Sequence, residues 1–328
     1  MKIHVKLGFL FFNLWFCLFS GTGFAADPNP PVVVVIRHAG VWANDGTLKP
    51  DQVRRMVEMG LQTLTNKKTA IEAMKGFFRP EEKIALKVNA ITANPNSATK
   101  PALTKILADL LLEIGVKPDH ITIYDRTPGK GRSELEPSGY QLCDKTGKIQ
   151  VRAGGTLGPK RKVGGLLAQF YSPIEEADAL INLPVLKDHH IMGLTFALKN
   201  HLGSILKPAS CHLNAGVPAI AELNMMAPIK RKQRLIVGDA LCGQFNKGPH
   251  DHPEFHWKEN AIILGIDPVA VDAVAFGILE RVRKDHGLSW PKEMKYGGKA
   301  GDYLKDCAKR GVGNLQPKVL EVNCSTEE

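Results

Sequence analysis

Short apolar runs alternate along the chain with longer stretches in which apolar residues recur at helical spacing. The runs, each typical of a buried strand, lie at residues 32–36, 84–90, 121–124, 179–183, 235–237 and 261–264. The helical stretches begin at Pro50, at Pro101 and just after Asp267, which suits an N-cap. Strand, helix and strand in this order predict parallel pairing through right-handed crossovers. The pattern therefore predicts an α/β fold, a three-layer domain with a mostly parallel sheet.

Residues 127–165 depart from this alternation, because glycine, proline and charged residues dominate them. Tyr140, Leu142 and Val151 still keep some apolar periodicity, which favours a folded excursion over a flexible linker. We expect one large insertion or lid here, within a single domain that spans residues 26–328.

Residues 1–25 carry the three parts of a secretory signal peptide. Lys2 and Lys6 precede an apolar run, and small residues occupy the positions that a signal peptidase reads before a cut after Ala25. The apolar run is too short to span a bilayer, so no stable membrane anchor is expected. The sequence predicts a periplasmic or secreted protein.

Charge and cysteine content narrow the class of protein further. The net charge of +10 falls by two when Lys2 and Lys6 leave with the signal, and the densest basic run, residues 230–234, lacks aromatic residues. A solvated loop explains this run better than nucleic-acid binding, for which a supporting motif is missing. After the signal the cysteines are odd in number, which argues against a disulfide-built scaffold: Cys143, Cys211, Cys242, Cys307 and Cys324.

Four segments resemble the motif blocks of one protein family. They read Ile-Ala-Leu-Lys-Val-Asn at 84–89, Asn-Leu-Pro-Val-Leu-Lys-x-His and then Gly-Leu-Thr-x-Ala-Leu-Lys-Asn-x-Leu-Gly within 182–203, Ile-Val-Gly-Asp at 236–239, and Gly-Ile-Asp-Pro-Val-Ala-Val-Asp-Ala at 265–273. In this order they resemble the bacterial and archaeal domain-of-unknown-function family 362. The resemblance implies that family's fold and leaves the reaction open. Some relatives look as though they carry an added ferredoxin-like segment, but this chain has no Cys-x-x-Cys and hence no iron–sulfur cluster motif.

Lysines and other polar residues follow the ends of the predicted strands, where ligands bind in open α/β sheets. Three lysines at one edge would repel one another unless an anion lay between them, so a small anionic ligand is predicted, either a carboxylate or a phosphate. The alternative is that each is an ordinary surface lysine. The residues predicted to bind this ligand are Lys87, Asn89, Lys187, Thr195, Lys199, Asn200 and Asp272. Those expected together on one edge of the sheet are Lys87, Asn89, Asp125, Lys187 and Asp239.

An apolar stripe follows His190 at helical spacing: Ile191, Leu194, Leu198 and Leu202. It predicts a helix on which Thr195 and Lys199 lie one turn apart beside the stripe. Lys199 is therefore expected to point toward the ligand, with neutralisation of Asp272 inside the fold as the alternative.

His189 and Asp239 are the predicted catalytic residues. His189 has the intrinsic pKa of a general base and the donor atoms of a metal ligand, and a histidine bonded to backbone is the alternative. Asp239 follows a strand, where it would contact the ligand or a metal, or else bond to the backbone of a turn. Asp272 interrupts an apolar helix and needs a partner, either Lys187 or Lys199, or a cation.

A second histidine group consists of His250, His252 and His256, with Cys211 and His212 upstream. Histidine at this density makes a divalent metal a candidate cofactor. The spacing matches no standard metal site, so ligand type alone carries the hypothesis.

These features favour an exported enzyme that acts on a small anionic substrate or cofactor at the strand ends, its reaction unassigned. The alternative is a non-catalytic ligand- or metal-binding module that serves a redox partner, as the cluster-bearing relatives suggest. A structural or adhesive role explains less, because it does not account for ionisable residues inside apolar blocks.

Overall fold

The computed structural model describes residues 29–126 and 133–325, so the predicted signal peptide lies outside the described residues. Its main sheet is built on β1 (Val32–Arg37), β2 (Ile84–Lys87), β3 (Ile121–Asp125), β4 (Gln150–Ala153), β7 (Ala179–Asn182), β10 (Gln233–Gln244), β12 (Ala261–Gly265) and β13 (Lys318–Asn323). The order across the sheet is β13-β1-β12-β10-β7-β2-β3-β4. Strand β12 runs antiparallel to both neighbours, and the other pairs on this path are parallel. The predicted α/β class with a mostly parallel sheet is confirmed.

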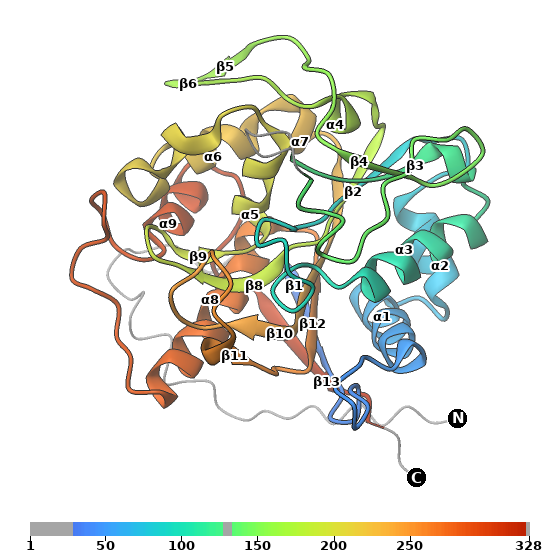
Figure 1. Ribbon diagram of the computed structural model, residues 1–328, viewed down its shortest axis with the longest axis horizontal. Helices are drawn as coiled ribbons and strands as arrows, with labels where there is room; N and C mark the ends of the chain where they lie inside the picture. Colours follow the sequence, from blue (N-terminus) through green and yellow to red (C-terminus); the bar gives the residue numbers. More distant parts are fainter. Residues whose placement is uncertain (1–28, 127–132, 326–328) are drawn as a thin grey trace.

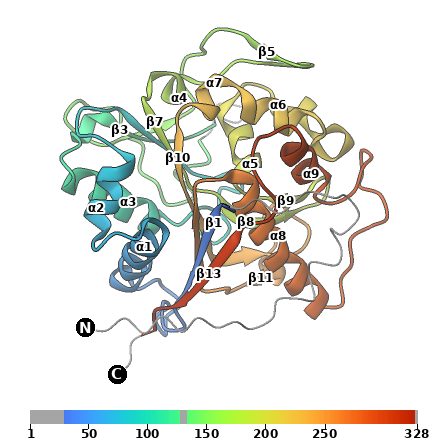
Figure 2. The same ribbon diagram turned by 180° about the vertical axis from the view of Figure 1, so that it is seen from behind.

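Helices cover both faces of this sheet, which gives the three predicted layers (Figures 1 and 2). One face carries α1 (Pro50–Thr65), α2 (Ala70–Phe77) and α3 (Pro101–Glu113). The other face carries α5 (Ala197–Asn200), α6 (Ala219–Met225), α8 (Pro268–Asp285) and α9 (Asp302–Lys309). Two further helices are short: α4 (Ser172–Glu176) and α7 (Ala227–Lys230). Strand β1 shows the division, because Val34 packs with the α1–α3 side and Val35 with the α8 side. Successive strand residues point to opposite faces, so each buried strand contributes to two cores.

The helix starts predicted from sequence are confirmed. Pro50 and Pro101 each stand at the first position of a helix. The Asp267 side chain accepts hydrogen bonds from the backbone N–H groups of Val269 and Ala270, so it caps α8 as expected. Among the described residues, no helix combines the length and the apolar character that crossing a membrane requires.

The helix predicted after His190 is wrong. The chain instead forms a small hairpin of β8 (Val185–His189) and β9 (Gly193–Thr195). Helical structure begins only at α5, a single turn, and continues as a short 3-10 helix at His201–Ser204. Gly193 has a φ of 87° at the turn, and Phe196 is non-helical at φ −157° and ψ −141°. Thr195 and Lys199 therefore lie on different elements, while β8 pairs in parallel with β10 and extends the sheet toward its carboxyl edge.

The stretch at 127–165 is partly built into the sheet. Its residues 150–153 form β4, the edge strand beside β3, whereas β5 (Arg161–Val163) begins a separate hairpin with β6 (Leu166–Ala168). Residues 127–132 lie outside the described residues, so the interpretation of the whole stretch as one insertion or lid stays a prediction.

Candidate functional site

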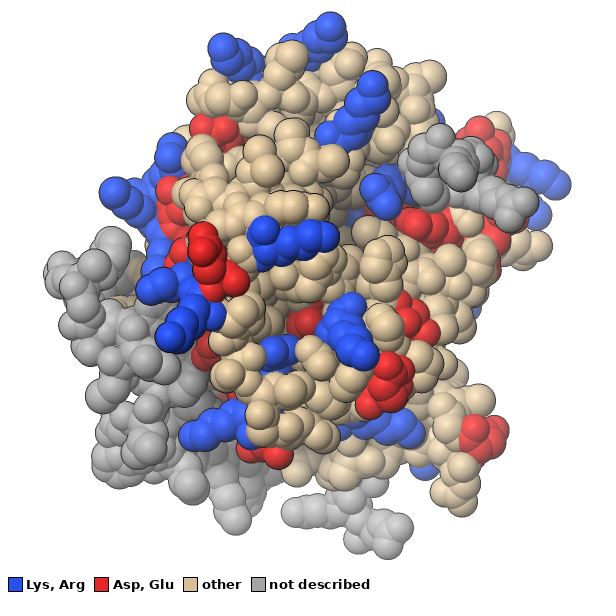
Figure 3. Space-filling model, turned by 60° about the vertical axis from the view of Figure 1, so that its left-hand side comes forward, with Lys and Arg blue, Asp and Glu red and all other residues tan. Residues whose placement is uncertain are grey.

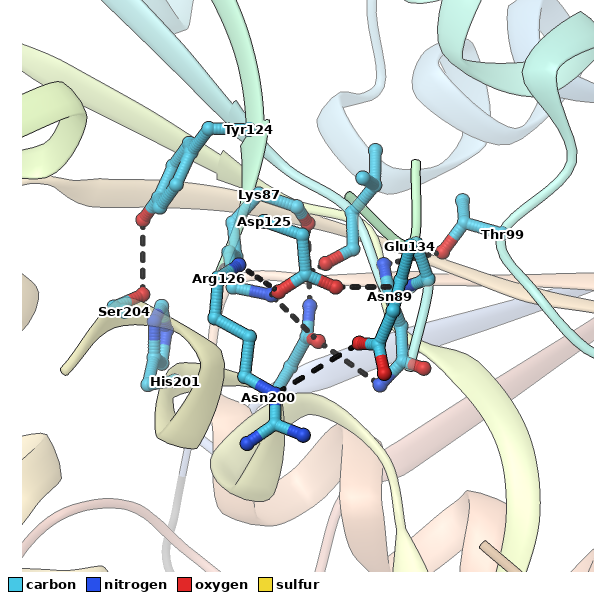
Figure 4. Close-up of polar contacts among 12 residues, drawn as sticks. Lys87, Asn89, Thr99, Tyr124, Asp125, Arg126, Glu134, Asn200, His201 and Ser204 are labelled. Carbon is cyan, nitrogen blue, oxygen red and sulfur yellow. Dashed lines mark hydrogen bonds and ion pairs between the residues drawn. The ribbon is translucent and has the colours of Figure 1, made fainter. Parts of the chain in front are cut away.

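A buried ion pair joins the carboxyl ends of β2 and β3. Lys87 Nζ donates to Asp125 Oδ1 at 2.7 Å and to Asn200 Oδ1 at 3.2 Å (Figure 4). Asp125 also accepts the backbone N–H of Ala90 and of Arg126, each at 2.7 Å. Burial lowers the pKa of Lys87, and Asp125 opposes that shift. The charged groups of this pair thus have hydrogen-bond partners within the fold, so Lys87 acts as the ion-pair partner of Asp125.

Gly203, the last residue of the motif block at 182–203, lies directly against the Lys87–Asp125 ion pair. A Cβ at this position would lie closer than 3.0 Å to both Asp125 Oδ1 and Lys87 Nζ. The backbone after α5 can approach the ion pair only because residue 203 has no side chain.

Lys187 is the second lysine at this edge, and it is fully buried on β8. Its Nζ donates to Asn89 Oδ1 at 3.1 Å, and Asn89 in turn donates to Asn200 Oδ1 at 3.3 Å. Burial, with the positive charge of Lys100 nearby, lowers the pKa of Lys187 to about 7. Amide contacts therefore connect Lys187 to Lys87, but Lys187 makes no ion pair with a carboxylate of the described residues.

Lys199, on α5, is 6% exposed. Its amine has no hydrogen bond or ion pair with any residue of 29–126 or 133–325. Burial, together with the positive charges of Lys187 and Arg126, lowers the pKa of Lys199 to about 7. Lys199 is therefore a largely buried lysine whose amine lacks an acceptor among the described residues.

Thr195 supplies a buried hydroxyl beside these lysines. Its Oγ1 is buried without a hydrogen-bond partner among the described residues. Thr195 lies opposite Lys187 in the β8–β9 ladder, and residues directly opposite in such a ladder share a face. The hydroxyl and the Lys187 ammonium thus emerge on the same side of the hairpin.

His189 stands at the end of β8 in a stack of three imidazoles. Its ring lies 5.2 Å from that of His190 and 5.4 Å from that of His212. Burial and the charge of Lys199 hold the pKa of His189 well below its usual range. Nδ1 accepts the Ile191 N–H at 3.2 Å, so in the neutral ring the hydrogen is on Nε2. This tautomer leaves the Nε2–H of His189 as a hydrogen-bond donor, and the general-base role predicted from sequence stays a prediction.

The two remaining acidic predictions are corrected by their contacts. Asp239 is fully buried at the same edge, but its oxygens accept the backbone N–H groups of Lys100 and Leu241, which fixes the start of α3. Asp272 pairs with neither Lys187 nor Lys199. Its oxygens accept the N–H groups of Ala197 and Leu198 at 2.6 and 3.2 Å, so it caps α5. Both side chains accept backbone N–H groups, which is the alternative that the sequence left open for Asp239, and a ligand contact of either residue stays a prediction.

The predicted metal residues are not gathered into a ligand set. Across the described residues, no group of three or more histidine, cysteine, aspartate or glutamate side chains is placed to hold a metal ion. His256 Nε2 contacts Asp251 Oδ1 at 2.9 Å, and His252 Nδ1 contacts Glu254 Oε1 at 3.3 Å. His250 joins neither pair. His212, which the sequence associated with this group, lies instead against His189.

Sequence reasoning missed three charged residues at this edge, Lys100, Arg126 and Glu134. Arg126 follows β3, and its Nε lies 3.8 Å from Glu134 Oε2 (Figure 4). Burial raises the pKa of Glu134 to about 7. Lys100 Nζ lies 4.0 Å from Asp239 Oδ2. Arg126 was detectable as the residue after a strand, whereas Glu134 comes from the irregular stretch and carried no sequence signal.

A hollow of about 940 Å³ lies at the opposite edge of the sheet, where β10 begins and α8 starts. Its charged residues include Arg234, which is already paired with Glu82 at 2.8 Å. On the face shown in Figure 3, lysine and arginine side chains are interspersed with aspartate and glutamate. Asn224 also lines this hollow, and its Oδ1 is buried without a hydrogen-bond partner among the described residues. The carboxyl edge remains the candidate site because it holds two buried lysines, Lys187 and Lys199, without an ion-pair partner among the described residues.

The fold and this edge define a class of protein: an α/β domain whose strand ends gather buried lysines and amides. A family model described as "Domain of unknown function (DUF362)" matches residues 84–277, more than half of the chain. The protein therefore belongs to the DUF362 family.

Its relatives include a thylakoid-associated protein, sll1697, of Synechocystis sp., 28% identical over 66% of this chain and 70% of that protein. Two solved structures also match. One is a protein of Thermotoga maritima, with 11% identity, 71% of this chain covered and a TM-score of 0.46. The other is the lactate racemase apoprotein of Thermoanaerobacterium thermosaccharolyticum, with 12% identity, 78% covered and a TM-score of 0.40. The matches span 59% of the length of each of these two chains.

Proposed function

We propose that this protein is an exported enzyme that binds a small anionic substrate, a carboxylate or a phosphate, at the carboxyl edge of its sheet. The observation that carries the proposal is the pair of buried lysines, Lys187 and Lys199, that no described carboxylate neutralises. Burial without a carboxylate partner penalises the charged form of a lysine, so an anion bound at this edge would stabilise it.

The neighbouring donors support this assignment. Thr195 Oγ1 is buried and has no hydrogen-bond partner in the part of the chain that the structure describes, and the His189 tautomer places a hydrogen on Nε2. Arg126 adds a third cation near Lys199. Ammonium, hydroxyl and imidazole N–H groups are the donors that a carboxylate or phosphate accepts from. Lys87 is excluded from this set because Asp125 already neutralises it.

The fold also supports a ligand at this place. The donors lie on β8, at the end of β9 and on α5, and Asn89 and Asn200 link Lys187 to Lys87 at the carboxyl end of β2. In open α/β sheets ligands bind outside those strand ends. Export rests on the features of residues 1–25 alone and is proposed on that basis.

Calorimetric titration with oxalate and with inorganic phosphate tests the proposal. The Lys187→Met variant should lose affinity by roughly 10- to 150-fold, the effect of about 1.5–3 kcal/mol for a hydrogen bond to a charged group. The matched control is Lys105→Met, which removes a lysine that is 75% exposed on α3 and should leave binding unchanged. Absence of binding by the wild-type protein, or an equal loss in both variants, would contradict the proposal.

A further inference from the structure

Lys187 and Lys199 share one site, but their surroundings differ in one respect. Lys187 Nζ has a fixed acceptor, Asn89 Oδ1 at 3.1 Å. Lys199 Nζ has none among the described residues. An acceptor stabilises the ammonium form, and its absence favours the neutral amine.

Repulsion between the two charges sharpens this difference. Each lysine lowers the tendency of the other to hold a proton when both are buried, so such a pair loses its first proton readily. The hydrogen bond to Asn89 Oδ1 favours Lys187 as the lysine that keeps the remaining proton. The positive charge of Arg126 acts in the same direction, against an opposing effect of Cys211. Lys199 in turn lowers the pKa of His189 and of His212, which places both imidazoles near its amine. Lys199 therefore presents a free amine next to a fixed positive charge.

A neutral amine with an unused lone pair is a nucleophile toward carbonyl carbon. We propose that Lys199 forms an imine with a small oxo acid whose carboxylate is held by Lys187, an inference that rests on the proposed function of this edge. The substrate class is thus narrowed from any small anion to a carboxylate that carries an aldehyde or ketone group.

The step balances without an added oxidant or reductant. The Lys199 nitrogen lone pair attacks the carbonyl carbon, a C–N bond forms, and the C=O π electrons move to the oxygen. The His189 Nε2–H donates a hydrogen bond to that oxygen as charge develops on it. The two hydrogens of the amine then reach the oxygen through solvent, water leaves, and a C=N bond remains. Lys187 is the binding residue in this step and Lys199 the catalytic residue.

Reductive trapping on the purified mature protein tests the proposal. Glyoxylate is the probe, because it is the smallest oxo acid, and cyanoborohydride reduces any imine to N-carboxymethyl-lysine, which peptide mass spectrometry locates. At neutral pH an amine with a pKa of about 7 has on the order of 10³ times more neutral form than an ordinary lysine. Lys199 should therefore be labelled at least about tenfold faster than exposed lysines such as Lys105.

The Lys187→Met variant tests the proposal through the pH dependence of labelling, which should not change if Lys187 has only a structural role. Removing the neighbouring charge should return Lys199 toward an ordinary lysine, so labelling at pH 7 should slow and recover at higher pH. Lys199→Arg keeps a cation but cannot form the imine, and it should abolish the labelled peptide.

Failure of the imine proposal can be distinguished from failure of the anion-binding proposal, because oxalate is an anion that has no aldehyde or ketone group. If Lys199 is labelled no faster than Lys105 while oxalate binding still depends on Lys187, the imine is refuted and the anion site stands. If oxalate is not bound either, both proposals fall. Preferential labelling of Lys187 would also overturn the assignment, because it would place the free amine on the other lysine.

Discussion

The buried pair of Lys87 and Asp125 gives the sharpest test of the distinction between structural and ligand-binding lysines. Lys87→Met removes the ammonium while keeping much of its aliphatic volume. The change deletes the 2.7 Å contact with Asp125 and the 3.2 Å contact with Asn200. Breaking a buried pair typically costs about 3–5 kcal/mol, because the remaining charge is left uncompensated. Asp125 keeps two backbone N–H donors, so we expect the lower end, about 3 kcal/mol, a large share of the roughly 5–15 kcal/mol that stabilises a domain.

Urea unfolding followed by tryptophan fluorescence measures this loss as a lower midpoint with an unchanged slope. Lys105→Met is the matched control, because Lys105 and Asp109 form an exposed pair at 2.6 Å, for which a cost of about 0.5 kcal/mol or less is expected. A loss below about 1 kcal/mol for Lys87→Met would refute the reasoning. It would mean that water or a ligand compensates Asp125 and that Lys87 belongs with the binding residues.

Four further outcomes follow from the same contacts. Lys199→Met should change the free energy of unfolding by about 1 kcal/mol or less in urea, because a buried amine without an acceptor contributes little stability. Burial raises the pKa of Asp272 from 3.8 to about 8, so between these pH values the folded state keeps a proton that the unfolded state loses. The free energy of unfolding should therefore fall as the pH rises from about 4 to about 8. Asp272→Asn should reduce this fall when unfolding is measured over the same pH range. Gly203→Ala should lower the thermal midpoint, since its Cβ would crowd the Lys87 ion pair. N-terminal sequencing of the exported protein should begin at Ala26, and an intact Met1 in a cytoplasmic fraction would contradict export.

Elements with local start signals could be predicted from the sequence. Pro50, Pro101 and Asp267 act on the residues directly after them, so the helices they begin are visible in a short window. The failure after His190 has the opposite cause. The apolar spacing there fits a helix, but Gly193 turns the chain at positive φ, and the cap of the single helical turn comes from Asp272, on another helix. No local pattern contains that partner.

The position of the site was predictable, whereas the roles of its acidic residues were not. Polar residues after parallel strands meet at one edge, and Lys87, Asn89, Asp125 and Lys187 are joined there by hydrogen bonds. Asp239 also lies at this edge but is engaged by backbone N–H groups. A carboxylate in an apolar block signals that a donor is required, and sequence does not tell whether that donor is a side chain, a cation or the backbone.

The three lysines of the motif blocks show how one residue type acquires different chemistry at one sheet edge. Lys87 has a carboxylate partner, Lys187 has an amide oxygen, and Lys199 has no acceptor within the described residues. Because an acceptor stabilises an ammonium group, we propose that the three residues act as ion-pair partner, anion anchor and free amine, respectively. Under this proposal, a ligand that contacts both Lys187 and Lys199 is anionic at one end and accepts a nucleophile at the other, which describes an oxo acid.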